Sequence, residues 1–179
     1  MDRRIVIADA AISLIAEAGI RALTHRAIDG AAGMPAGSTS YYFRTKRGLV
    51  TAVVARITES SRAKFEAGPA QSADPVDVTV EYVAHLLSER MDHLKARHAL
   101  LIDPSVDAEA RAALGRSLFS VERAVGLFGD RPTAEGYVAL CEGLVLTALA
   151  GGYTAASLRV PLARYFRGTN LPGRGQPKS

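Results

Sequence analysis

Between Thr24 and Lys46 the chain combines small, hydroxylated and basic side chains that could contact a nucleic acid. The stretch from Gly37 to Tyr42 reads Gly-Ser-Thr-Ser-Tyr-Tyr. Small residues let a backbone approach DNA, hydroxyl groups bond phosphates or bases, and tyrosines can do the same while packing against sugars or thymine methyl groups. Arg26 could form a forked pair with guanine, and Lys46 could hold a phosphate. These residue types predict a reader of the DNA major groove.

Residues that contact the major groove in this way are expected to lie on short helices. Thr24 offers a hydroxyl N-cap for a helix that runs to about Ala32, and Gly33 supplies the positive φ that a sharp turn requires. Pro35 suits the first turn of the next helix, which we expect to carry residues 36–43. Two short helices joined by a glycine turn predict a helix-turn-helix, in which the second helix enters the major groove.

Longer helices are expected on both sides of this motif. Apolar residues recur at spacings of three and four from residue 3 to 17, and Gly19 can end that helix. After the motif, Thr45 can cap a helix over residues 46–66, whose apolar stripe includes Leu49, Val53, Ile57 and Ala63. The first 65 residues therefore read as four helices.

Beyond a loop at residues 67–75, rich in Gly, Pro and small residues, helical periodicity returns. It predicts long helices over 76–98 and 106–128, a helix over 134–153 capped by Thr133, and a short helix over 158–166 with an interruption near Pro161. The helix over 134–153 is apolar nearly all round and should be covered on every side. No segment alternates as a strand should, so we predict an all-α fold of about nine helices.

The motif residues resemble those of the TetR family of regulators. The match runs over residues 4–52 and includes the stretch from Leu23 to Met34, Gly37 to Phe43, and Thr45-Lys46. Departures from the family pattern are Ser40 in place of Tyr, Pro35 in place of Ser or Thr, and Arg47-Gly48 in place of an acidic residue. Together, the residue chemistry and the resemblance imply a DNA-contacting set consisting of Thr24, His25, Arg26, Ala36, Gly37, Ser38, Thr39, Ser40, Tyr41, Tyr42 and Lys46.

The resemblance also implies a division of the chain. A DNA-binding domain would occupy residues 1–48, linked by the helix 46–66 to a helical regulatory and dimerisation domain at 70–168, with a disordered tail at 169–179. The last two helices would form a four-helix interface in a homodimer. Candidate interface residues are Tyr137, Leu144, Leu149, Leu158 and Tyr165, and candidate residues of an effector pocket are Leu87, Met91, Leu94, His98, Leu118 and Cys141.

Composition limits the other classes of protein. The net charge is +4, with seven basic against four acidic residues in 1–50 and ten against fourteen in 51–150, which suits a phosphate-binding head on an acidic body. The most apolar stretch, residues 139–150, is too short to span a bilayer, and the N-terminus lacks a secretory pattern, so we expect a cytoplasmic protein. The single Cys141 excludes an internal disulfide and suits a small buried residue better than a redox switch.

A metal site and an enzyme are weaker interpretations. Glu81 and Glu89 each precede a histidine by four residues, and with His98 these histidines, His85 and His93, could suggest metal sensing. We favour solvated or pocket-lining side chains, and we expect no cofactor and no metal, because no catalytic motif is present.

The sequence therefore predicts a ligand-responsive transcriptional regulator, acting as a repressor on a palindromic operator. The alternatives are a helical protein-interaction module with a basic head and a helical enzyme that modifies small molecules.

Overall fold

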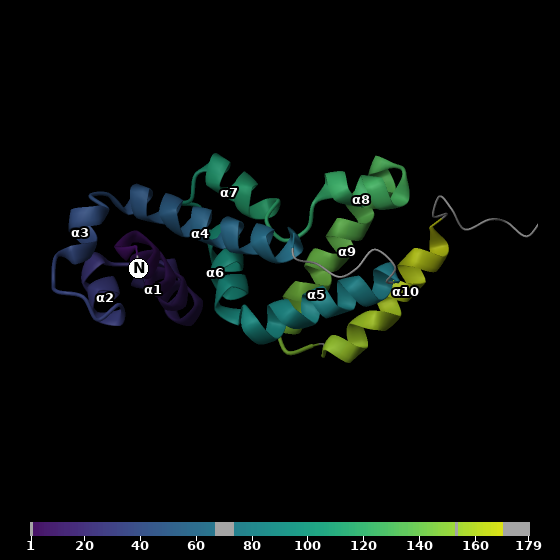
Figure 1. The fold of residues 1–179 in the computed structure, drawn as a ribbon, viewed down its shortest axis with the longest axis horizontal. Coiled ribbons are helices and arrows are strands. Elements are labelled where there is room, and N and C mark those ends of the chain that lie inside the picture. Colours follow the sequence, from purple (N-terminus) through teal and green to yellow (C-terminus); the bar gives the residue numbers. More distant parts are fainter. Residues whose placement is uncertain (1, 67–73, 153, 170–179) are drawn as a thin grey trace, which may run out of the picture. The chain divides into compact units, whose positions relative to one another are not determined.

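The structure, a computed structural model, describes residues 2–66, 74–152 and 154–169. This described part contains only α-helices and short 3₁₀ helices, which confirms the all-α prediction (Figure 1). The helices are α1 (Arg3–Ala18), η1 (Ile20–Ala22), α2 (His25–Ala31), α3 (Ser38–Tyr42), α4 (Lys46–Glu66), α5 (Pro75–Glu89), α6 (Met91–Ile102), α7 (Ala108–Gly115), α8 (Val121–Phe128), α9 (Arg131–Leu149), η2 (Ala155–Leu158) and α10 (Arg159–Gly168). The predicted tail from residue 170 and the side chain of Ala63 lie outside the described residues.

The chain divides into two compact units. Unit 1 comprises Met1–Gly68 and Arg90–Leu118, and unit 2 comprises Pro69–Glu89 and Phe119–Ser179. Unit 1 therefore holds the predicted helix-turn-helix together with α6 and α7, which come much later in the sequence. No helix in the described part of either unit is long and apolar enough to cross a bilayer.

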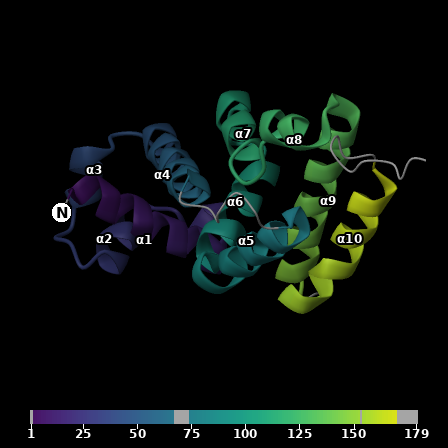
Figure 2. The ribbon, with the colours of Figure 1, turned by 45° about the vertical axis from the view of Figure 1, so that its right-hand side comes forward.

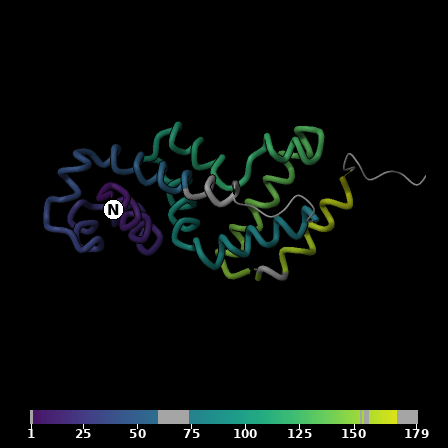
Figure 3. The backbone as a smooth tube through the Cα atoms, in the orientation of Figure 1, coloured from purple at the N-terminus to yellow at the C-terminus, as the bar shows by residue number. Residues whose placement is uncertain are grey.

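One apolar core joins the helices of unit 1. The predicted stripe residues Leu49, Val53 and Ile57 of α4 are buried in it against α1, as the periodicity indicated. From α6 and α7, Leu100 and Leu114 enter the same core. The backbone trace in Figure 3 shows the short helices and their turn leading directly into α4. The predicted helix-turn-helix thus packs on a core to which both sequence segments of unit 1 contribute.

In unit 2, α8 packs along α9, and α5 contacts α9, η2 and α10. Figure 2 shows α9 and α10 side by side. Aromatic rings of α8, α9 and α10 pack together. The ring centroids of Tyr137 and Tyr165 are 6.3 Å apart, and those of Phe128 of α8 and Phe166 of α10 are 5.2 Å apart. Aromatic rings bury large apolar areas, so this cluster contributes to the packing of the unit.

Two predicted long helices are each broken in the structure. The helix expected over 76–98 is interrupted at Arg90, where φ is −131° and ψ is 24°, and the helix expected over 106–128 is interrupted between Gly115 and Val121. Both breaks fall at a boundary between the units. Apolar spacing stays nearly in phase across one or a few non-helical residues, so periodicity alone did not reveal them. Ser120, whose hydroxyl accepts a hydrogen bond from the Arg123 amide, caps the second segment.

Two helix starts and one predicted interruption also differ from prediction. Helix α3 begins at Ser38 rather than near Pro35, because Gly37 adopts a left-handed φ of 90°. Helix α9 is capped by Asp130, whose carboxylate accepts from the Thr133 amide at 2.9 Å, rather than by Thr133. Helix α10 is not interrupted at Pro161, since a proline in the first turn lacks only an amide that would be free there.

Candidate nucleic-acid interface

The helix-turn-helix begins as the sequence indicates. Thr24 has an extended backbone, and its Oγ1 accepts a hydrogen bond from the Ala27 amide at 3.2 Å, which starts α2. His25 and Arg26 occupy the first turn of α2, with His25 partly buried and Arg26 exposed. Gly33 has a φ of 62°, in the region that favours glycine, and it turns the chain after α2.

A buried carboxylate fixes the start of α3. Asp29, on α2, is only 4% exposed. Its Oδ2 accepts a hydrogen bond from the Gly37 amide at 2.7 Å, and its Oδ1 accepts from the Thr39 amide at 2.7 Å and the Thr39 hydroxyl at 2.6 Å. These bonds, the Thr39 hydroxyl first, lower the pKa of Asp29 below its ordinary value. Helix α3 is therefore anchored to α2 by one ionised side chain.

The sequence interpretation missed this role of Asp29. The available signal was an aspartate that directly follows the fully buried Ile28 within a short helix. Thr39 was predicted to contact DNA, but the structure buries it completely and its hydroxyl bonds Asp29. Its side chain is thus bonded inside the protein and is not part of the exposed surface of α3.

The outer face of α3 carries the remaining hydroxylated and aromatic residues. Tyr41 is 80% exposed and Ser40 is exposed, whereas Ser38 and Tyr42 are partly buried. The rings of Tyr41 and Tyr42 meet edge to face with centroids 5.2 Å apart. Ala36 and Gly37, in the preceding turn, are both exposed. The face that points away from the core is therefore small at one end and aromatic at the other.

A cation from the first helix supports the aromatic end. The guanidinium carbon of Arg4 lies 5.9 Å from the ring centroid of Tyr42 and 5.3 Å from that of Phe43. Phe43 itself is buried in the unit 1 core. Guanidinium groups favour such positions over aromatic faces. Arg4, which sequence reasoning did not select, thus helps to hold Tyr42 in place.

Basic residues surround the start of α4. The Thr45 hydroxyl accepts from the Gly48 amide at 3.1 Å and caps the helix as predicted. Lys46 is exposed, and its Nζ lies 3.5 Å from the Ile20 carbonyl oxygen, within reach of a weak hydrogen bond. The exposed Arg47 forms a long ion pair with Asp107. Together with α3, these residues give one end of unit 1 the groups that a phosphate backbone requires.

The candidate pocket residues fall in both units. Leu87 and Cys141 belong to unit 2, and the others belong to unit 1. Leu94 and Leu118 are buried, Met91 is partly buried, and His98 Nδ1 lies 2.8 Å from the Leu94 carbonyl oxygen. Burial raises the pKa of Cys141 to about 12.

The histidines of the weaker interpretation do not form a metal site in the described residues. His85 belongs to unit 2, while His93 and His98 belong to unit 1. No group of three or more potential ligands occurs among the described residues. The pKa of His93 is lowered to about 4, and burial contributes more to this shift than the nearby charges do. This imidazole is therefore neutral at pH 7.

The candidate dimer residues differ in exposure. Leu144 and Leu158 are buried within the chain, while Tyr137, Leu149 and Tyr165 are partly buried. The Tyr137 hydroxyl lies 2.7 Å from that of Thr79, and the Tyr165 hydroxyl donates to the Thr133 carbonyl at 2.6 Å.

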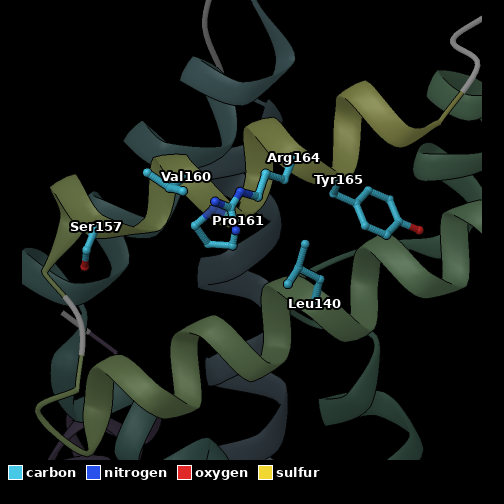
Figure 4. A pocket seen from close by; sticks show the side chains of 6 residues that line it. All are labelled: Leu140, Ser157, Val160, Pro161, Arg164 and Tyr165. Carbon is cyan, nitrogen blue, oxygen red and sulfur yellow. The ribbon is translucent and has the colours of Figure 1, made fainter.

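Other apolar groups on α9 and α10 do face outward. Leu146 is 55% exposed and Val160 is 56% exposed, so α9 is not covered on every side within one chain. A hollow of about 620 Å³ lies between these helices (Figure 4), lined by Leu140, Ser157, Val160, Pro161, Arg164 and Tyr165.

Comparisons with known proteins agree with this geometry. Residues 7–53 match the family described as bacterial regulatory proteins, tetR family. A search of curated protein sequences gave no match. Among solved structures, the multidrug binding protein EbrR in complex with ethidium is 26% identical, with 92% of this chain and 98% of that chain covered and a TM-score of 0.70.

Two further structures extend the likeness over nearly the whole chain. A TetR family member from Streptomyces coelicolor A3 is 27% identical over 92% of this chain and 98% of that one, with a TM-score of 0.69. A transcriptional regulator from Rhodococcus sp. is 19% identical over 94% and 98%, with a TM-score of 0.74, and supports the fold alone. The motif match and the shared fold lead to one conclusion: residues 7–53 match the tetR family of bacterial regulatory proteins, and the chain has the fold of TetR family regulators.

Proposed function

We propose that this regulator is a repressor that binds a palindromic DNA operator as a homodimer and is released by a small-molecule effector. The observation that carries the proposal is the anchored α3, whose outer face presents Ser40 and Tyr41 while Asp29 holds its start. A rigid recognition helix with an exposed polar face can enter a major groove without first being ordered. The DNA-binding domain would be residues 1–48, as the sequence indicated.

We assign base and backbone contacts to different residues. Arg26, exposed at the start of α2, would read a base, and Tyr41, Tyr42 and Ser40 would contact bases or sugars. Lys46, exposed at the start of α4, would hold a phosphate together with the helix amides. A base contact changes sequence preference, whereas a phosphate contact changes affinity for all sequences alike.

The dimer would form through α9 and α10. Exposed Leu146 of α9 and exposed Val160, which lines the hollow between α9 and α10, supply apolar surface that association would bury. Leu144 and Leu158 would support this face from inside the chain. Replacing Leu146 with Glu should shift the protein to monomer in analytical ultracentrifugation. The control is Ile102→Glu, which places the same charge at an 84% exposed apolar residue of unit 1 and should leave the dimer intact.

The effector proposal draws on a relative. EbrR, a multidrug binding protein, has been solved with ethidium and with malachite green. We propose that the regulatory domain of this chain, residues 70–168 in the sequence interpretation, likewise binds a small molecule that favours a state unable to bind DNA. Leu87, Met91, Leu94, His98, Leu118 and Cys141 stay the candidate pocket residues.

Selection from random duplex DNA tests the proposal. The purified protein should enrich a palindrome, and Arg26→Ala should relax one base preference in it, while Lys46→Ala should weaken all sequences alike. The matched control is Arg167→Ala, which removes an exposed arginine of α10 in unit 2. Absence of enrichment at low salt, with a monomeric protein, would instead favour a helical protein-interaction module. Chemical turnover of a bound ligand would favour an enzyme.

A further inference from the structure

Arg47 makes an ion pair that ties the start of α4 to the loop between α6 and α7. Its Nε lies 3.6 Å from Asp107 Oδ2, and the two side chains are 83% and 41% exposed. This distance exceeds the 2.7–2.9 Å or so of a strong charge-assisted hydrogen bond. Both groups lie within unit 1. The pair is therefore formed but weak, and it is open to exchange with another anion.

The position of Asp107 is set independently of Arg47. Its Oδ1 accepts a hydrogen bond from the Ala110 amide at 2.8 Å, so the carboxylate is the N-cap of α7. One carboxylate oxygen thus holds the helix, and the other faces Arg47. The acid stays in place whether or not Arg47 remains with it.

A second carboxylate lies in the same basic surroundings. The Ser105 hydroxyl, the Ser105 amide and, to a smaller extent, the charges of Lys46 and Arg21 lower the pKa of Asp103. The loop and the start of α4 also line a hollow of about 430 Å³, whose residues are Lys46, Arg47, Val50, Ser105, Val106 and Asp107. The loop between α6 and α7 therefore places the carboxylates of Asp103 and Asp107 near the basic side chains at the start of α4.

We propose that Arg47 is a further DNA-contacting residue, and that it exchanges Asp107 for a backbone phosphate when DNA binds. Only residues 43–45 separate α3 from α4, so the start of α4, to which Arg47 belongs, lies at the end of unit 1 that carries α3 (Figure 1). A guanidinium pairs with phosphate as well as with carboxylate. Contact with DNA also releases counterions, a gain that the intramolecular pair lacks. Asp107 then competes with the phosphate for Arg47 and thereby lowers the affinity of the protein for DNA.

This inference rests on the proposed DNA binding, and a double-mutant cycle tests it. The probe is a 30-base-pair duplex of mixed sequence, because phosphate contacts do not depend on sequence. Its affinity is measured by fluorescence anisotropy over a range of KCl concentrations. Asp107→Asn removes the charge but keeps the cap, since asparagine caps helices as well as aspartate does. The control is Glu109→Gln, which removes an exposed charge from the first turn of α7.

Asp107→Asn should tighten binding roughly two- to fourfold, the range expected for release of a weak surface pair in one or two protomers. Arg47→Ala should weaken binding and reduce the slope of log K against log [KCl] by about one for each engaged protomer. In the Arg47→Ala background, Asp107→Asn should have no further effect. Glu109→Gln should change affinity by much less.

The outcomes separate the two claims. If the wild-type protein does not bind the duplex at low salt, the proposed function fails and the inference fails with it. If the wild type binds but Asp107→Asn equals Glu109→Gln, or acts equally with and without Arg47, the exchange is refuted while DNA binding stands. Thermal unfolding of each variant, expected to match the wild type within about 2 °C for such surface changes, verifies that the fold is unchanged.

Discussion

Replacing Asp29 with Ala should destabilise the protein and remove its recognition helix from the DNA-binding position. Three donors lose their acceptor in this variant, namely the Gly37 amide and the amide and hydroxyl of Thr39. The Gly37 residue is exposed, so water can replace its bond at little cost. Thr39 is 0% exposed, and its two donors would be left buried without a partner.

The magnitude follows from these two donors. A buried unsatisfied donor costs about 1–3 kcal/mol, so Thr39 alone predicts a loss of about 3 kcal/mol. For a chain of this size that loss corresponds to a fall in Tm of about 6–12 °C. Asp29→Asn keeps one oxygen for Thr39 but turns an amide group toward the Gly37 amide, so it should cost about half as much.

Urea unfolding and DNA binding measured on the same variants provide the assay. The control is Asp92→Asn, an exposed acid of unit 1 that accepts a hydrogen bond from Ser13 at 3.2 Å and should be near neutral. The pKa of Asp29 is lowered in the folded state, so its stabilisation is present above pH 4 and is lost as the pH falls further. The Asn variant should lack this dependence. An unfolding free energy of Asp29→Ala within 0.5 kcal/mol or so of the wild-type value would refute the reasoning.

Three other predictions concern packing and titration. In Gly136→Ala, the added Cβ would lie 2.5 Å from the Tyr165 hydroxyl oxygen, so urea unfolding should show a loss of about 1–2 kcal/mol. Gly143→Ala in the same helix meets nothing within 4 Å and should stabilise by about 0.5–1 kcal/mol. Because the folded pKa of His93 is about 4 and its unfolded value is 6.5, stability should fall as the pH drops from 6.5 to 4, by about 1–2 kcal/mol after allowance for solvent screening of this partly buried group. In a pH series of unfolding curves, His93→Gln should abolish that part. With a pKa of about 12, native Cys141 should react with dithiobis(nitrobenzoate) at pH 8 at least about a hundredfold more slowly than in denaturant, and equal rates would contradict its burial.

The sequence was most informative where local chemistry decides the structure. Thr24 and Thr45 cap their helices as predicted, and Gly33 adopts the positive φ that its turn requires. These features depend on hydrogen bonds and backbone angles within three or four residues, which a single sequence displays. The helix-turn-helix and the family could therefore be predicted from residues 4–52 alone.

Features that depend on tertiary contacts could not be predicted in the same way. The break at Arg90 lies where the chain passes from unit 2 to unit 1, and no local residue type marks it. Likewise, Thr39 carries the hydroxyl expected of a DNA contact but is buried by its pairing with an aspartate ten residues earlier. Periodicity and residue type describe which groups are available, while burial decides which of them still face solvent.

Asp29 and Asp107 show how burial changes the consequence of one residue type. Both carboxylates accept amide hydrogen bonds at the start of a following helix. Asp29 is buried, and both of its oxygens accept hydrogen bonds from the residues that begin α3. Asp107 is 41% exposed, and its second oxygen meets only the weakly held Arg47. A carboxylate of the first kind anchors α3 to α2, whereas one of the second kind is the kind that DNA phosphate would displace in the exchange proposed above. In the proposed function, the anchored reading helix would set which sequence is bound, and the exchangeable ion pair would limit how tightly DNA is bound.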